Sequence, residues 1–159
     1  MEHRASMWLA AIALAGVSGF AAAQTVKIGI ISTYSGPTAA QGDQLDKGYK
    51  LYLKLNAGKL PPGVKLEPIF RDDTGANPDA AKRLAQELIV RDKVQFLTGV
   101  VWTPNAAAIA PLTAESKVPF VIANAAGANI PLLSPYVARF SFTLWQAAYP
   151  MGKCAAKHY

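Results

Sequence analysis

Residues 26–37 read VKIGIISTYSGP, a short run of mostly β-branched residues that passes directly into a turn rich in Ser, Gly and Pro. An apolar run of this length, bounded by turn residues, predicts a buried β-strand over 26–31. The next segment, 41–56, repeats apolar residues at intervals of three and four, with acidic residues early and basic residues late. That pattern predicts a helix whose charges suit the helix dipole. The folded part of the chain therefore opens with a strand followed by a helix.

The same alternation continues to the end of the chain. Further strands are predicted around 64–70 and over 94–101, 119–123 and 137–142, and helices over 77–91, from 103 past 112, and over 149–157. Pro68 assigns the second strand to a sheet edge or a bulge, because proline cannot donate to the ladder. Short apolar strands separated mostly by helices predict an α/β fold, with a doubly wound, mostly parallel sheet covered by helices on both faces.

Two helix starts carry the same local signal. Asn77 and Thr103 each precede a proline, which predicts a capping residue followed by the first helical residue. The helix after Thr103 also contains Pro111, which predicts a kink or a late start.

Length, charge and cysteine content limit the possible classes of protein. The chain has 159 residues, 52% of them apolar, and a formal charge of +6, which suits one globular domain with a packed core. Its basic residues are dispersed and no basic–aromatic motif occurs, so we expect no nucleic-acid partner. Cys154 is the one cysteine, which excludes internal disulfides and cysteine-rich zinc sites. Within a predicted helix it is expected to be a small buried residue.

Residues 1–23 have the pattern of a secretory signal peptide. Arg4 precedes an uncharged stretch from Met7 to Phe20, and small residues end the segment at Ala23. An uncleaved membrane anchor is the alternative, but the apolar run falls short of the roughly 20 residues that a spanning helix needs. We predict cleavage after Ala23 and a periplasmic mature protein.

Ligands of parallel α/β sheets bind beyond the carboxyl ends of the strands, which here selects the loops 34–43, 72–77, 102–105 and 124–129. The helix amino terminus at Thr103 offers free N–H groups to an anion, and the Thr103 hydroxyl either binds a carboxylate or only caps its own helix. The loop Ala125–Gly127 has no bulky side chains, so its backbone can approach a small ligand, although an ordinary flexible loop has the same composition. Trp102 and Trp145 are candidates for an aromatic pocket wall, with plain core packing as the alternative.

Catalytic patterns are absent from the sequence. It contains no G-x-S-x-G elbow, phosphate loop or dinucleotide fingerprint, and the one histidine after residue 23 is His158, next to the last residue. The adjacent pair Asp72 and Asp73 is expected in a solvated turn or as a helix cap rather than as a metal pair. No catalytic residue, metal or cofactor is therefore predicted.

One longer motif resembles a known family. KIGIISTYSGPTAAQGDQ, residues 27–44, is similar to the opening of the type I periplasmic solute-binding proteins of branched-chain amino acid ABC transporters, the leucine/isoleucine/valine-binding family. Later stretches of the same resemblance follow in the same order, at 71–81, 96–101, 117–126 and 134–142. The resemblance covers essentially all of the chain after residue 23.

The resemblance implies a two-lobed receptor that closes around a small ligand, a branched-chain amino acid or a related small carboxylate, and delivers it to a membrane permease of an ABC importer. It also implies that Thr103 and the backbone of Ala125, Ala126 and Gly127 hold the ligand's carboxylate and amino groups. Gln41 stands where leucine-type members carry an aromatic side chain. With Trp102 beside the anion site, this departure favours a different carboxylate ligand, with aromatic acids among the candidates.

The resemblance also sets the expected domain organisation. Residues 24–159 would form an incomplete amino-terminal ligand-binding lobe, with the second lobe absent. We then expect exposed apolar surface and little high-affinity binding, since one open lobe cannot enclose a ligand. A ligand-sensing lobe of a receptor or regulator, and an exported α/β enzyme, are the alternative functions.

Overall fold

The structure is a computed structural model that describes residues 24–158, and the predicted signal peptide lies outside the described residues. Its strands are β1 (Gln24–Ser32), β2 (Val64–Asp72), β3 (Phe96–Gly99), β4 (Phe120–Ile122) and β5 (Val137–Arg139). Its α-helices are α2 (Ala39–Asn56), α3 (Pro78–Gln86), α4 (Thr103–Ser116) and α5 (Leu144–His158). Short helical turns η1 (Ala57–Lys59), η2 (Glu87–Arg91) and η3 (Ile130–Leu133) complete the order. The alternation of strand and helix is the predicted one.

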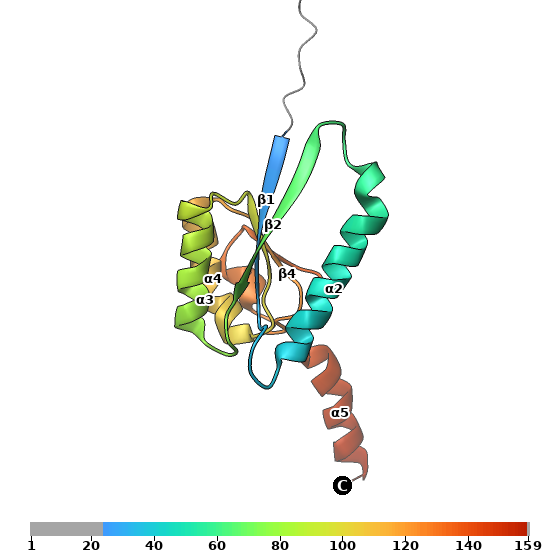
Figure 1. Cartoon of the computed structure of the whole chain (residues 1–159). Helices are drawn as coiled ribbons and strands as arrows, with labels where there is room; N and C mark the ends of the chain where they lie inside the picture. The colour runs from blue at the N-terminus through green and yellow to red at the C-terminus, as the bar shows by residue number, and fades with distance from the viewer. Residues whose placement is uncertain (1–23, 159) are drawn as a thin grey trace, which may run out of the picture.

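The five strands form one parallel sheet in the order β2-β1-β3-β4-β5. β2 is an edge strand, as Pro68 predicted, and Pro68 lies opposite Ile28 in the β1–β2 register. Figure 1 shows α3 and α4 on one face of the sheet and α2 on the other. The predicted α/β fold with helices on both faces is therefore confirmed.

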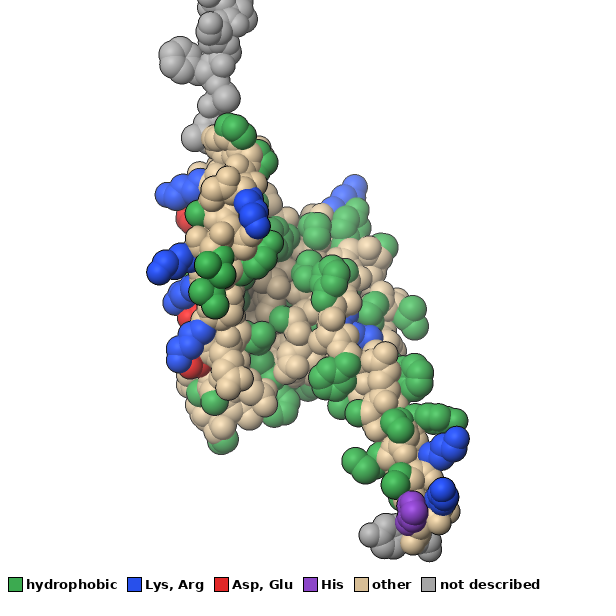
Figure 2. All heavy atoms as spheres, turned by 90° about the vertical axis from the view of Figure 1, so that its right-hand side faces the viewer, with side chains coloured by type: hydrophobic (Ala, Val, Ile, Leu, Met, Phe, Trp, Pro, Cys, Tyr) green, Lys and Arg blue, Asp and Glu red, His purple; other side chains and the backbone are tan. Residues whose placement is uncertain are grey.

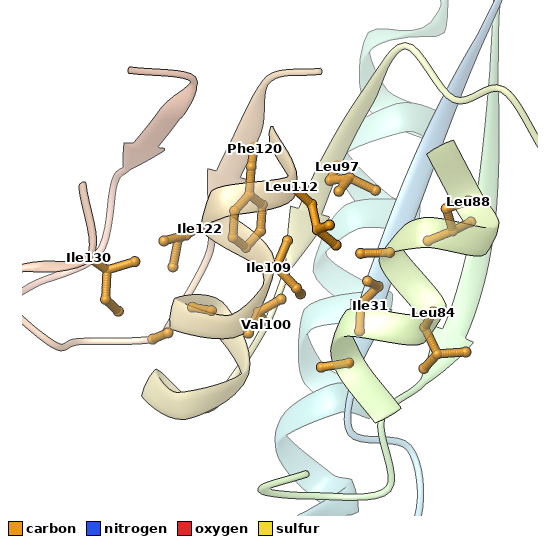
Figure 3. Packing of buried hydrophobic residues seen from close by; sticks show 14 of the residues in the cluster. Ile31, Leu84, Leu88, Leu97, Val100, Ile109, Leu112, Phe120, Ile122 and Ile130 are labelled. Carbon is orange, nitrogen blue, oxygen red and sulfur yellow. The ribbon is translucent and has the colours of Figure 1, made fainter. Parts of the chain in front are cut away.

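The main core lies between the sheet and the α3–α4 layer, as Figure 3 shows. Side chains of β1, β3 and β4, among them Ile31, Leu97 and Phe120, meet Leu88 of η2 and Ile109 of α4, and each of these is at most 2% exposed. Apolar burial on this scale is the main term that stabilises a domain. It holds the carboxyl ends of β1, β3 and β4 in fixed positions.

The other face and the carboxyl-terminal helix are packed more loosely. Gly42 is the one buried residue of α2, whose outer side carries lysines, and α5 has none that is buried. Figure 2 shows apolar side chains spread along α5, which extends away from the sheet. Cys154 is exposed there, so its predicted burial is wrong: its helix meets no second layer. Among residues 24–158 no helix has the length and apolar character that a membrane crossing needs.

Several predicted boundaries differ from those in the structure. The strand predicted over 94–101 ends at Gly99, because Gly99 and Val100 adopt φ angles of 102° and 62°. A side chain at Gly99 would place its Cβ 2.2 Å from the Ile31 carbonyl oxygen, so the close approach of the two strands requires glycine. The strand predicted over 137–142 ends at Arg139, and the last helix starts at Leu144 rather than Tyr149.

Candidate ligand-binding site

All strands of the parallel sheet end at the same edge, and the loops that follow β1, β2, β3 and β4 lie there. These are the loops that the sequence selected, and α4 begins directly after one of them. A helix start at this edge presents N–H groups that have no partner within the helix, together with the positive end of the helix dipole. The edge therefore favours a negatively charged ligand group.

Thr103 lies at this helix start, in a position that differs from the predicted one. It is the first residue of α4, whereas Trp102 occupies the N-cap and makes no side-chain capping bond. The Thr103 hydroxyl instead accepts a hydrogen bond of 3.1 Å from the N–H of Gly127. The prediction that Thr103 caps its helix is wrong, because α4 begins one residue earlier than predicted and Thr103 already lies within it. A hydroxyl has one hydrogen and a second lone pair, so Thr103 can still donate to a carboxylate.

Gly127 fits closely against Thr103. A Cβ at residue 127 would lie 2.5 Å from Thr103 Cγ2 and 3.3 Å from Ile130 Cδ1. Distances under about 3 Å are not tolerated without movement, so glycine at this position lets the loop reach the helix start. The structure therefore joins two of the predicted site elements, Thr103 and the loop Ala125–Gly127.

Hydrogen bonds from other parts of the chain hold the rest of that loop in place. The Ala125 N–H donates to Val100 O at 3.0 Å, and the Leu144 N–H donates to Ala126 O at 3.0 Å. The Arg139 guanidinium donates to Gly127 O. The N–H groups of Ala125 and Gly127 both have partners, whereas the N–H of Ala126 has no hydrogen-bond partner among the described residues. Sequence reasoning did not single out Arg139 within the stretch 134–142, because only the pairing of β5 with β4 brings it to this loop.

Trp102 is half-buried beside Thr103, and its indole is held by a buried polar cluster. Its Nε1–H donates to Thr33 Oγ1 at 3.2 Å, and the Thr33 hydroxyl donates to Asp73 Oδ1 at 2.7 Å. Asp73 is 0% exposed, so its predicted place in a solvated turn or as a helix cap is wrong. The helix that follows is capped by Asn77 instead, whose side chain accepts from the Ala80 N–H at 3.1 Å, as predicted.

The two remaining candidates make no hydrogen bond to this group among the described residues. Gln41 is exposed on the first turn of α2 and lines a hollow of about 360 Å³ with Gln44, Leu45 and Asn124. Trp145, the second residue of α5, is 59% exposed. The hollow is next to the loop Ala125–Gly127 at Asn124, and Trp145 directly follows Leu144, whose N–H is bonded to Ala126 O. The structure therefore joins Trp102, Thr103 and residues 125–127, with Gln41 and Trp145 at the edge of that group.

Tyr34 in the β1–α2 loop and Asp72 at the end of β2 both have a perturbed pKa. Burial, followed by the charges of Asp46, Asp72 and Asp73, raises the pKa of Tyr34 to about 12. Burial opposes ionisation of Asp72, but hydrogen bonds from Ser35 and from the Tyr34 and Thr74 N–H groups outweigh it and lower its pKa. Both shifts keep the present protonation states at neutral pH. Within residues 24–158 no three His, Cys, Asp or Glu side chains form a group that could hold a metal ion.

Comparison with known proteins gives consistent relatives. A family model described as periplasmic binding protein matches residues 25–159. Leu/Ile/Val-binding protein homolog 6 of Brucella abortus (strain 2308) is 40% identical over 155 residues, which are 98% of this chain and 39% of the relative. The chain thus spans about two fifths of the length of that curated relative.

Solved structures of solute-binding proteins of ABC transporters share the fold. One from Rhodopseudomonas palustris, in complex with 4-hydroxybenzoate, has a TM-score of 0.79 and 43% identity, covering 84% of this chain and 36% of that one. Another, from R. palustris BisB5 in complex with 3,4-dihydroxybenzoic acid, has a TM-score of 0.77 and 46% identity over the same shares. A leucine-binding protein from Thermotoga maritima has a TM-score of 0.68 and 25% identity, covering 74% of this chain and 33% of that one.

Proposed function

The chain belongs to the periplasmic binding protein family, and from this we propose that it forms a ligand-binding lobe of a solute-binding protein whose ligand is an aromatic carboxylate of the hydroxybenzoate class. One observation carries the choice of ligand: relatives solved with hydroxybenzoates are 43–46% identical to this chain, whereas the leucine-binding structure is 25% identical. The family is one of binding proteins, so we favour binding over an enzymatic role and over a separate sensory role.

The ligand's carboxylate binds at the start of α4. There the Thr103 hydroxyl donates one hydrogen bond, the Ala126 N–H donates another, and the helix terminus contributes a partial charge of roughly half an electron. Hydrogen bonds to a charged acceptor are about twice as strong as neutral ones. Two such donors beside a helix terminus suffice to orient a benzoate.

The aromatic ring packs against Trp102. Offset or edge-to-face contacts between two aromatic rings contribute about 0.5–1.5 kcal/mol beyond the buried area. A leucine side chain gains no such contact from an indole. Gln41 and Trp145 remain candidates for contacts farther from the carboxylate, where a hydroxyl substituent would meet the polar hollow that Gln41 lines.

In this proposal residues 1–23 are a signal peptide that exports the chain, and residues 24–159 are one lobe of a two-lobed receptor. The relatives that bind hydroxybenzoates are components of ABC transporters, so the partner is the membrane permease of such an importer. A branched-chain amino acid is the second candidate ligand, because the curated relative at 40% identity is named for leucine, isoleucine and valine.

The proposal is tested by titrating the ¹⁵N-labelled chain with 4-hydroxybenzoate and, separately, with leucine, and by following the amide signals of Thr103 and residues 125–127. We expect the chemical shifts of these signals to change when 4-hydroxybenzoate is added and to remain unchanged when leucine is added. Thr103→Val should weaken binding by about 1–3 kcal/mol through loss of a charge-assisted bond. Thr103→Ser, which keeps the hydroxyl, is the matched control. Shifts with leucine alone would reject the aromatic ligand.

A further inference from the structure

We propose that Asp73 is a positioning residue that acts through Thr33 to fix the indole of Trp102, so that Trp102 meets the ligand with its ring and not with its N–H. The inference rests on the proposed function in one respect, since it takes Trp102 as a wall of the ligand site. The positioning itself follows from the contacts of three fully buried side chains, Thr33, Asp73 and Asn105.

The hydrogen bonds of this cluster have a defined direction. A carboxylate can only accept, and Asp73 Oδ1 accepts from the Thr33 hydroxyl at 2.7 Å and from the Gly75 N–H at 3.2 Å. Thr33 has a single hydroxyl hydrogen, which it gives to Asp73. Its oxygen is therefore left as an acceptor, and the Trp102 Nε1–H donates to it at 3.2 Å. By accepting the Thr33 hydrogen, the Asp73 carboxylate leaves the Thr33 oxygen free to accept from the Trp102 indole N–H.

The same carboxylate holds the start of α4. Its second oxygen accepts from Asn105 Nδ2 at 2.8 Å, and that amide also donates to Gly75 O at 2.8 Å. Asn105 lies two residues after Thr103 in the first turn of the helix. Asp73 therefore connects the loops after β1 and β2 with the helix start, beneath the group formed by Trp102, Thr103 and Gly127.

The carboxylate has no cation to offset its burial. No Lys or Arg among residues 24–158 forms an ion pair with Asp73. A buried charge without a cation is costly unless several hydrogen bonds satisfy it. Here three donors do so, and a charged acceptor at the end of a chain of hydrogen bonds strengthens the bonds before it. The Trp102–Thr33 bond is therefore firmer than a bond to an isolated hydroxyl.

This arrangement has a consequence for ligand recognition. Because the indole N–H is already donated to Thr33, it is not available to a ligand oxygen. Trp102 then contributes ring surface in a fixed orientation, and the polar contacts are left to Thr103 and Ala126. A ligand with an aromatic ring gains from a preoriented wall, since no rotamer freedom of the indole is lost on binding.

The test uses the exchange rate of the Trp102 Nε1–H with water, measured by NMR on the full chain. The chain has three tryptophans, and the variants Trp102→Phe and Trp145→Phe assign their indole signals. In the wild type we expect the Trp102 Nε1–H to exchange about tenfold more slowly than that of exposed Trp145, as a hydrogen-bonded, half-buried group should. Equal rates in the wild type would overturn the proposal without any variant.

The variants separate the roles of the two residues. Thr33→Val keeps the shape and removes the hydroxyl, and should speed exchange of the Trp102 Nε1–H about fivefold, the equivalent of one net hydrogen bond. Thr33→Ser restores the hydroxyl and should restore slow exchange. Asp73→Asn removes the charge and places a side-chain NH₂ group, itself a donor, opposite at least one of the present donors. It should speed exchange of the Trp102 Nε1–H about threefold, less than Thr33→Val, because only the charge assistance to the Trp102–Thr33 bond is lost. Wild-type exchange in Asp73→Asn would overturn the role of Asp73.

A ligand titration of the same samples distinguishes this proposal from the proposed function. With 4-hydroxybenzoate, the ring signals of Trp102 should shift in the wild type and in Thr33→Ser, and about fivefold more ligand should be needed in Thr33→Val. No shift in the wild type would count against the proposed function, whereas the exchange rates decide the positioning role by themselves. Equal affinity of Thr33→Val and the wild type would contradict the link between indole orientation and binding.

Discussion

The contact between Gly127 and Thr103 allows a steric prediction with an internal rescue. In Gly127→Ala the new Cβ would lie 2.5 Å from Thr103 Cγ2, so either the loop or the start of α4 must move. Movement also lengthens the 3.1 Å hydrogen bond from the Gly127 N–H to Thr103 Oγ1. The Ile130 side chain, which is 0% exposed, lies 3.3 Å from the same Cβ position and closes the other direction.

The expected loss of stability follows from these two effects. Overpacking a well-filled site costs typically about 1–3 kcal/mol, and one lost hydrogen bond costs about 1 kcal/mol. Because a hydrogen bond and a clash at one contact are not independent, we expect Gly127→Ala to lower the free energy of unfolding by about 2 kcal/mol. Thr103→Ser removes the methyl group that causes the clash and keeps the hydroxyl. Alone, it should cost less than about 1 kcal/mol.

Urea unfolding of the two single variants and of Gly127→Ala/Thr103→Ser completes a double-mutant cycle. The double variant should recover most of the stability that Gly127→Ala loses, which gives a favourable coupling of about 1 kcal/mol or more. Gly127→Ala with wild-type stability would refute the close contact. A double variant no more stable than Gly127→Ala would show that Thr103 Cγ2 is not the obstacle.

Two further predictions concern a helix cap and a titrating side chain. Asn77→Ala should lower the free energy of unfolding by about 1 kcal/mol, since it removes the acceptor for the Ala80 N–H. Asn77→Ser keeps an acceptor and should retain most of the wild-type stability. Equal stability of Asn77→Ala and the wild type in urea unfolding would exclude the cap. The pKa of Tyr34, raised to about 12, lies above the value near 10 of an unfolded tyrosine, so the folded chain holds this proton more tightly. Its contribution to stability is complete below about pH 10 and is lost as the pH rises toward 12. The check is an absorbance titration of the tyrosine phenolates, in which Tyr34→Phe should remove part of the change near pH 12. A titration curve identical to that of the wild type in this range would contradict the prediction.

The sequence predicted the features that depend on neighbouring residues. The alternation of strands and helices, the edge position of β2 and the Asn77 cap each follow from a local pattern, and each is present in the structure. The loops at the carboxyl edge follow from these, because a parallel sheet places all strand ends together. That is why Thr103 and Gly127 could be grouped before their contact was known.

Features that depend on distant residues were not predicted. Asp73 is buried and hydrogen-bonded to Thr33 and Asn105, which are 40 and 32 residues away in the chain. No local sequence pattern predicts partners at such separations. Gly99 ends β3 early because of its distance to Ile31, which lies on another strand. Cys154 illustrates the opposite error: an apolar helix face predicts burial only where a second layer covers it.

The central claim is that an aromatic carboxylate binds at the start of α4, between Thr103 and the loop that ends at Gly127. A crystal structure of the chain with 4-hydroxybenzoate tests it most directly. We predict the carboxylate within hydrogen-bonding distance of Thr103 Oγ1 and the Ala126 N–H, with the ligand ring against the Trp102 indole. A ligand bound elsewhere, or bound here with its ring toward Thr103 and its carboxylate turned away, would contradict the claim.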